Sequence, residues 1–185
     1  MKKLPTLQDW TIDTDLNRDW EANYDLFASQ IDWCCDQAGR SGLKVLIEPH
    51  PYRMVSSAIG MRYLLDRVKR DNLGFNFDSS HLFPGGDMPQ CAIYQLRGKI
   101  WHTHLSDNDS FTNAHWRPGK GKINWNAVMK ALRDIDYNGA LSFELEDVPG
   151  ASHPNVIGND SIGDDLHLAM EYIREVAQDA GLTIE

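Results

Sequence analysis

Four short apolar runs in this sequence each end in a side chain that can bind a metal ion. Side chains alternate along a strand, so one face of such a sheet is apolar and the other gathers polar groups toward the strand ends. The carboxyl ends of parallel strands meet at one edge of a sheet, where α/β proteins place their chemistry. The sequence therefore predicts one shared site, made of Glu48, Asp78, His104 and Glu144 at the ends of residues 45–48, 75–78, 100–104 and 141–144.

These four residues form a mainly hard ligand set of three carboxylates and one imidazole. Such a set suits a single divalent cation and leaves positions open for substrate oxygens. We expect Mn²⁺, with Mg²⁺, Co²⁺ or Zn²⁺ as alternatives. Any one of the four taken alone would be interpreted as an exposed or capping polar side chain. The hypothesis therefore depends on all four occurring at corresponding strand ends.

Apolar residues with helical spacing separate the four strand-like runs. Strands that alternate with helices at roughly 30-residue spacing are typical of repeated β/α units and a parallel sheet. We therefore predict an α/β fold with four strands, in one domain over residues 1–185, with residues 1–17 as an extended arm or loop. Helices are expected over residues 18–38, over 58–69, from Asp87, from near Asn124 to Gly139, and over 164–180.

The composition is that of one globular domain. The 185 residues are 42% hydrophobic and 24% charged, with three cysteines and a net charge of −9. An odd number of cysteines indicates no disulfide framework, and the acidic balance argues against a nucleic-acid partner. No apolar stretch approaches the roughly 20 residues that span a bilayer, and the start of the chain lacks a signal-peptide core. We expect a cytoplasmic protein with a small polar substrate and no membrane partner.

Five stretches of the sequence resemble one known family in their order and spacing. They are residues 46–50, 75–81, 102–107, 118–125 and 142–144. They are similar to the xylose isomerase-like TIM barrels, a superfamily that includes sugar phosphate isomerases and epimerases, inosose dehydratases and the AP endonuclease family 2 enzyme endonuclease IV. The resemblance implies a TIM (β/α)8-barrel type of fold, of which this chain offers only about four β/α units, the C-terminal half.

The same resemblance implies roles for the four strand-end residues. Glu48, Asp78, His104 and Glu144 would bind one catalytic metal ion, and the catalytic pair Glu48 and Glu144 would also carry protons. One glutamate would remove a proton from the carbon beside a carbonyl group, and the other would return it on the opposite face. A metal ion bound to the carbonyl and hydroxyl oxygens stabilises the developing enediolate. This implies a divalent-metal-dependent isomerase or epimerase of a sugar or sugar phosphate.

Four further residues are candidates for substrate binding. His81 lies just past the second strand, and the matching histidine of the family contacts substrate. His50 shares a strand face with Glu48. His115 and Arg117 lie in the loop after the third strand, where a cation could hold a substrate hydroxyl, carboxylate or phosphate. Loop histidines that bond only to backbone, and a solvated arginine, are the structural alternatives.

The chain is short for a complete barrel. A TIM barrel has eight strands and typically about 250 residues, so the first half is not represented in this sequence. A half-barrel leaves two open sheet edges and an uncovered interior, which favours association. We therefore expect a homo-oligomer, or pairing with a separate N-terminal half, unless the chain is a truncated fragment.

Three alternative functions use parts of the same pattern. A dehydratase of a cyclic polyol or keto acid would use the same site with a leaving hydroxyl group. A DNA-repair endonuclease of the endonuclease IV type would use a three-metal cluster with an Asp-x-His pair. Here Asn113 stands in place of that aspartate, and the chain is acidic. A non-catalytic fragment would bind metal or sugar without exchanging protons.

Overall fold

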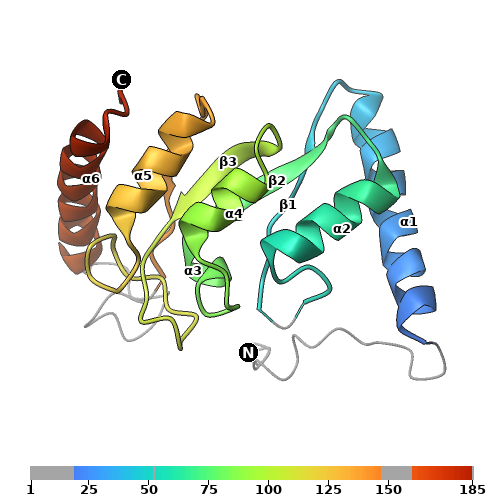
Figure 1. Cartoon of the computed structure of the whole chain (residues 1–185), viewed down its shortest axis with the longest axis horizontal. Helices are drawn as coiled ribbons and strands as arrows, with labels where there is room; N and C mark the ends of the chain where they lie inside the picture. Colours follow the sequence, from blue (N-terminus) through green and yellow to red (C-terminus); the bar gives the residue numbers. More distant parts are fainter. Residues whose placement is uncertain (1–18, 52, 147–159, 185) are drawn as a thin grey trace.

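The structure is a computed structural model and describes residues 19–51, 53–146 and 160–184. At its centre lies a parallel sheet whose strands follow one another in chain order, β1-β2-β3-β4 (Figure 1). This consecutive order, with a helix between successive strands, is that of a β/α barrel wall, so the predicted fold class is confirmed. The strands are β1 (Val45–Ile47), β2 (Leu73–Asp78), β3 (Ile100–Leu105) and β4 (Ser142–Phe143).

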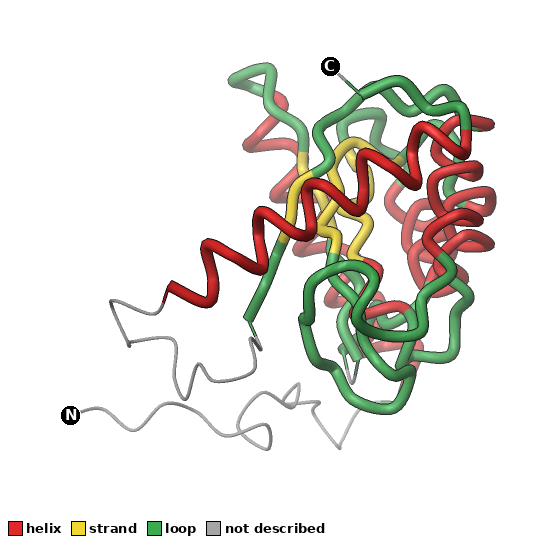
Figure 2. The backbone as a smooth tube through the Cα atoms, turned by 90° about the vertical axis from the view of Figure 1, so that its left-hand side faces the viewer, coloured by secondary structure: helices red, strands yellow, loops and turns green. Residues whose placement is uncertain are grey.

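The helices of the described residues pack side by side, with α1 on α2, α2 on α4, α4 on α5 and α5 on α6 (Figure 1). The loops that follow β1, β2 and β3 gather at one end of the molecule, the lower end in Figures 1 and 2. The carboxyl ends of the strands are therefore brought together, as a shared site requires. The helices are α1 (Trp20–Gly39), α2 (Ala58–Val68), α3 (Ser79–Leu82), α4 (Pro89–Gln95), α5 (Trp125–Asp134) and α6 (Asp160–Ala180).

The sheet is most deeply buried at its centre. All six residues of β2 are buried, and Leu73, Phe75 and Phe77 have no exposed surface. The edge strands β1 and β4 are only half-buried. The apolar strand residues join helix residues such as Met61 and Trp125 in one core. The polar ends of the central strands are therefore carried by the most tightly packed part of the fold.

Side-chain caps set where three helices begin. Asp19 caps α1 through the N–H of Ala22, and Ser57 caps α2 through the N–H of Gly60. Asn124 caps α5 in the same way. Each cap accepts an N–H of the first turn that has no partner within the helix. Ser57 and Asn124 stand where the sequence places helix starts.

The end of α5 differs from the prediction that this helix runs to Gly139. Its last residue is Asp134, because Asp136 takes the left-handed conformation, with φ 55°. The N–H of Tyr137 then donates to the carbonyl oxygen of Leu132 at 3.0 Å, which closes the helix as a Schellman motif. The predicted end was wrong because a residue other than glycine makes the left-handed turn.

The helix α6 also differs from its predicted form. It begins at Asp160, and Leu166 and Met170, which the spacing places inside, are 36% and 39% exposed. Its 21 residues exceed the 10 residues of α5, so α5 cannot cover its whole length. The predicted arm at residues 1–17 lies outside the described residues. No helix in the described part of the chain is long and apolar enough to cross a membrane.

Candidate metal site

The four strand-end residues of the predicted site come together. Nδ1 of His104, on β3, lies 2.8 Å from a carboxylate oxygen of Glu48 and 2.8 Å from one of Glu144. Oδ2 of Asp78, at the end of β2, lies 3.9 Å from the same nitrogen. One donor atom from each of the four residues falls within 4.8 Å of all the others. The spacing of the four runs thus predicted that these side chains lie together.

The amide of Asn76 supports this cluster and was not assigned a role from the sequence. Its Nδ2 donates to Glu48 Oε1 at 2.7 Å and lies 3.2 Å from Nδ1 of His104. Asn76 is two residues before Asp78 on β2, so both side chains point to the same face of the sheet. That spacing is the signal by which it could have been found.

Helix α3 begins at the metal site and follows from Asp78. Oδ1 of Asp78 accepts the N–H groups of Ser80 and His81, at 2.7 and 3.0 Å. These bonds satisfy two N–H groups of the first helical turn. They also fix the carboxylate so that Oδ2 faces the cluster. One buried residue therefore ends β2, starts α3 and presents an oxygen to the site.

The two glutamates of the cluster hold protons more tightly than usual. Burial raises the pKa of Glu48, and the negative charge of Asp78 raises it further. Burial, followed by the interaction with Asp78, raises the pKa of Glu144 to about 7. Burial alone would also raise the pKa of Asp78, but the neighbouring imidazoles, His115 first, lower it below its ordinary value. Asp78 therefore favours its ionised form, while Glu144 can change protonation near neutral pH.

The donor set fits a divalent cation. Oδ2 of Asp78 is buried and has no hydrogen-bond partner among the described residues. The single Nδ1 of His104 faces both Glu48 and Glu144, and one ring N–H cannot serve two carboxylates fully. Three carboxylates so close together repel one another unless a proton or a cation lies between them. Glu48, Asp78, His104 and Glu144 are the residues that would hold such an ion.

Three histidines form a second group beside Asp78. The ring centroids of His50 and His81 are 4.0 Å apart, and those of His81 and His115 are 4.7 Å apart. Nδ1 of His81 is 2.8 Å from the side-chain oxygen of Asn113, and Nε2 of His115 is 3.6 Å from Oδ2 of Asp78. The structure thus places the three predicted substrate-binding histidines together, next to the four candidate ligands.

His115 is the most strongly perturbed of the three histidines. Burial alone would lower its pKa, but Asp78 raises the pKa of His115 to about 8. Only 1% of its side chain is exposed. Asp78 therefore favours the protonated form of His115 in the metal-free protein.

Arg117, the fourth predicted substrate-binding residue, contacts α6. Its Nε donates to Oδ1 of Asp165 at 3.1 Å. No direct contact joins Arg117 to the four candidate ligands within the part of the chain that is described. Its place in the loop after β3 nevertheless keeps it at the end of the sheet where the site lies.

Asp107 organises the glycine-rich loop that follows Arg117. This fully buried carboxylate accepts the N–H groups of Gly119 and Ile123, each at 3.0 Å, and the indole N–H of Trp125 at 2.9 Å. A Cβ on Gly121 would lie 2.3 Å from Oδ1 of Asp107. The loop glycine thus permits close approach to a carboxylate, and this role of Asp107 was not predicted from the sequence.

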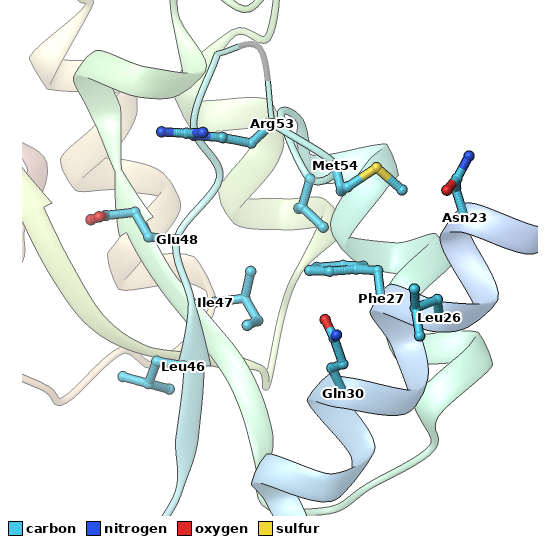
Figure 3. A pocket seen from close by; sticks show the side chains of 10 residues that line it. Asn23, Leu26, Phe27, Gln30, Leu46, Ile47, Glu48, Arg53 and Met54 are labelled. Carbon is cyan, nitrogen blue, oxygen red and sulfur yellow. The ribbon is translucent and has the colours of Figure 1, made fainter. Parts of the chain in front are cut away.

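A cavity of about 470 Å³ lies between α1 and β1. Figure 3 shows Ile47 pointing toward Phe27 of α1, whereas Leu46 and Glu48 point to the opposite side of the strand. The guanidinium of Arg53 lies on the same side of the strand as Glu48 (Figure 3). The alternation predicted for the first strand is therefore confirmed.

Comparison with known proteins identifies the family. The model of the family described as "xylose isomerase-like TIM barrel" matches residues 9–176. The chain therefore belongs to this family, and the resemblance of the five sequence stretches is confirmed. Membership by itself covers enzymes with several different reactions.

Two curated relatives illustrate that range. The inosose isomerase of Bacillus licheniformis is 30% identical over 118 residues, and the 3-dehydroshikimate dehydratase of Bacillus anthracis is 25% identical over 134 residues. The alignments cover 60% and 63% of this chain, but 42% and 48% of the relatives. The chain thus spans about half the length of the curated relatives that it matches.

A solved structure supports the fold. The D-psicose 3-epimerase determined in the presence of D-fructose superposes with a TM-score of 0.72 over 91% of this chain and 61% of its own. The two sequences are 23% identical, so the likeness concerns the fold alone.

Proposed function

We propose that this chain carries the metal-binding part of an isomerase or epimerase that acts on a sugar or polyol. The observation that carries the proposal is the pair Glu48 and Glu144, which approach Nδ1 of His104 from the two edge strands at 2.8 Å each. Burial raises the pKa of both glutamates, and that of Glu144, at about 7, suits a group that exchanges protons near neutral pH. Two such carboxylates on opposite sides of a small site can remove a proton from one face of a carbon and return it to the other.

The four candidate ligands would hold one divalent cation, for which we prefer Mn²⁺. When bound, it would stabilise negative charge that develops on the substrate oxygens. Asp78 would remain an ionised ligand because its pKa is lowered, whereas Glu48 and Glu144 would serve as the base and the acid. Asn76 would keep Glu48 in place through its 2.7 Å hydrogen bond.

The three grouped histidines would bind substrate on the side of Asp78. His81 is held by Asn113, so the orientation of its ring is fixed before substrate arrives. His50 lies against His81, and His115 lies on the other side of that ring. Their polar edges would bind substrate hydroxyl groups and orient the carbon that exchanges its proton.

A dehydratase is the second candidate, and His115 is the observation that favours it. Elimination of water needs an acid that protonates the leaving hydroxyl group. The buried imidazole of His115 lies 3.6 Å from Oδ2 of Asp78, and in the metal-free protein this carboxylate raises the pKa of His115 to about 8. The relative named 3-dehydroshikimate dehydratase agrees with this alternative.

Deuterium exchange tests the isomerase proposal. We expect the chain, incubated with Mn²⁺ and D-fructose or an inosose in D₂O, to introduce one carbon-bound deuterium, detected by mass spectrometry. Glu144→Gln and Glu48→Gln should each slow this exchange at least about a hundredfold, because each removes one proton carrier. Glu171→Gln is the matched control, since Glu171 is an exposed residue of α6 that pairs with His167.

Two outcomes would count against the proposal. Exchange at the wild-type rate in Glu144→Gln would exclude this residue as a proton carrier. Loss of water from the substrate without solvent exchange in recovered substrate would favour the dehydratase instead.

A further inference from the structure

One ion pair joins the loop after β3 to α6. Nε of Arg117 donates to Oδ1 of Asp165 at 3.1 Å. The side chains are 26% and 15% exposed, so water screens the pair only in part. The carboxylate of Asp165 therefore compensates much of the positive charge of Arg117 and restricts the conformations of the Arg117 side chain.

The backbone keeps Arg117 beside the candidate site. Trp116 forms an antiparallel bridge with Asp107, with N–H to carbonyl distances of 2.8 and 2.9 Å. The bridge holds the segment of His115 and Arg117 just beyond the carboxyl end of β3. His115 lies 3.6 Å from Asp78, and Arg117 follows it by two residues in the same loop.

The loop beyond Arg117 is also fixed by contacts, with Asp107 and with α6. Asp107 binds the N–H of Gly119, and the ring of Tyr172 on α6 would lie 2.9 Å from a Cβ added there. Gly119 has a φ of +86°, which favours glycine. The Arg117 segment is thus fixed to β3 on one side and to α6 on the other.

The charges around this segment do not favour an anionic substrate. With all three ionised, the charges of Glu48, Asp78 and Glu144 are balanced by one divalent cation together with Arg53 beside Glu48, so no positive charge is left over to attract an anion. Arg117 is compensated by Asp165. Lys120 and Lys122, the other cations of the loop, are exposed to solvent.

We propose that Asp165 is a positioning residue that neutralises Arg117 and so restricts the site to uncharged sugars or polyols. The proposal rests on the isomerase or epimerase function above and names its substrate class. The nitrogens Nη1 and Nη2 of Arg117 remain able to donate to a substrate hydroxyl, while the carboxylate of Asp165 repels a phosphate or carboxylate at the same place. Phosphorylated sugars are thereby excluded by charge.

Binding measurements on variants of the chain test this inference separately from turnover. We would titrate D-fructose and D-fructose 6-phosphate into the protein by calorimetry, with Mg²⁺ present. Asp165→Asn should raise the affinity for the phosphate ester roughly tenfold, because a like-charge contact is removed, and leave that for D-fructose nearly unchanged. The gain should shrink as salt is added.

Asp164→Asn is the matched control, because Asp164 is the neighbouring residue of α6, is exposed and loses the same charge. Asp165→Glu keeps the charge and should behave as the wild type. The proposal is overturned if Asp165→Asn and Asp164→Asn have equal effects, if Asp165→Asn has none, or if the wild type prefers the phosphate ester tenfold or more. Because binding is compared between variants, these results hold even if deuterium exchange fails, which would reject only the proposed function.

Discussion

The central strands and the edge strands of the sheet carry different kinds of site residue. All six residues of β2 are buried, whereas β1 and β4 are half-buried throughout. The same contrast holds for the carboxylates, since the side chain of Asp78 has no exposed surface, while those of Glu48 and Glu144 are 31% and 32% exposed. The centre thus holds a fully buried carboxylate, and the edges carry the two glutamates that we propose as the proton carriers.

The hydrogen bonds explain why the two regions differ. Asp78 is bound by two backbone N–H groups of α3, which hold it whether or not a ligand is present. Glu48 and Glu144 depend instead on His104, and Glu48 also on Asn76. Side-chain partners adjust more easily than backbone, so the edge glutamates are held less rigidly than Asp78.

Core truncation gives the largest expected contrast between the two regions. Phe77→Ala should lower the free energy of unfolding by about 3 to 5 kcal/mol, because it leaves a cavity under the central strand. Phe143→Ala, on the half-buried β4, should cost clearly less. Urea unfolding measures both. Equal losses of unfolding free energy would mean that the edge strand is as well packed as the central strand, which would contradict the contrast between them.

Adding a metal ion should slow amide exchange mainly in the edge strands β1 and β4. At a hundredfold excess over its dissociation constant, a cation that binds only the folded state adds about 2.7 kcal/mol of stability. Since the candidate ligands come from all four strands, we expect amide exchange in β1 and β4 to slow more than in β2 and β3. Hydrogen exchange with and without EDTA checks this. The variant Asp78→Asn should lose the response, and uniform protection of all strands would contradict the prediction.

The fold and the clustering of the four strand-end residues were predictable because their signals are local. Each strand ends in its candidate ligand within a few residues, and alternation along a strand needs no knowledge of the rest of the chain. Asn76 could have been found in the same way, from its position two residues before Asp78. The prediction of the helix end at Gly139 failed because Asp136 makes the left-handed turn, which side-chain type alone does not reveal.

Long-range partners were not predictable. Asp107 bonds to Gly119, Ile123 and Trp125, and Arg117 reaches Asp165, 48 residues later. Nothing in the spacing of those residues marks them as neighbours, because the contacts arise only when the loop folds back on β3 and α6 packs beside it. The sequence indicated the chemistry of the site, and packing determined how its loops are held.

The smallest expected effect is the pH dependence of metal affinity. It arises because the metal-free protein holds a proton on Glu144 that the metal-bound protein does not. Because the pKa of Glu144 is raised to about 7 in the folded chain, its proton stabilises the metal-free fold below its unfolded pKa, and this contribution is lost as pH rises through about 7. A bound cation must displace that proton, so metal affinity should fall about tenfold per pH unit below pH 7. Metal titrations by calorimetry across this range measure the slope.

Two variants sharpen that measurement. Glu144→Gln should weaken metal binding and flatten its pH dependence, because the competing proton is gone. Glu171→Gln, on the exposed side of α6, should keep the wild-type slope. Burial and the charge of Asp78 are the causes of the raised pKa, so in the metal-free protein Asp78→Asn should lower the pH at which Glu144 loses its proton. A metal affinity that does not change with pH would mean that the edge glutamate carries no proton to exchange.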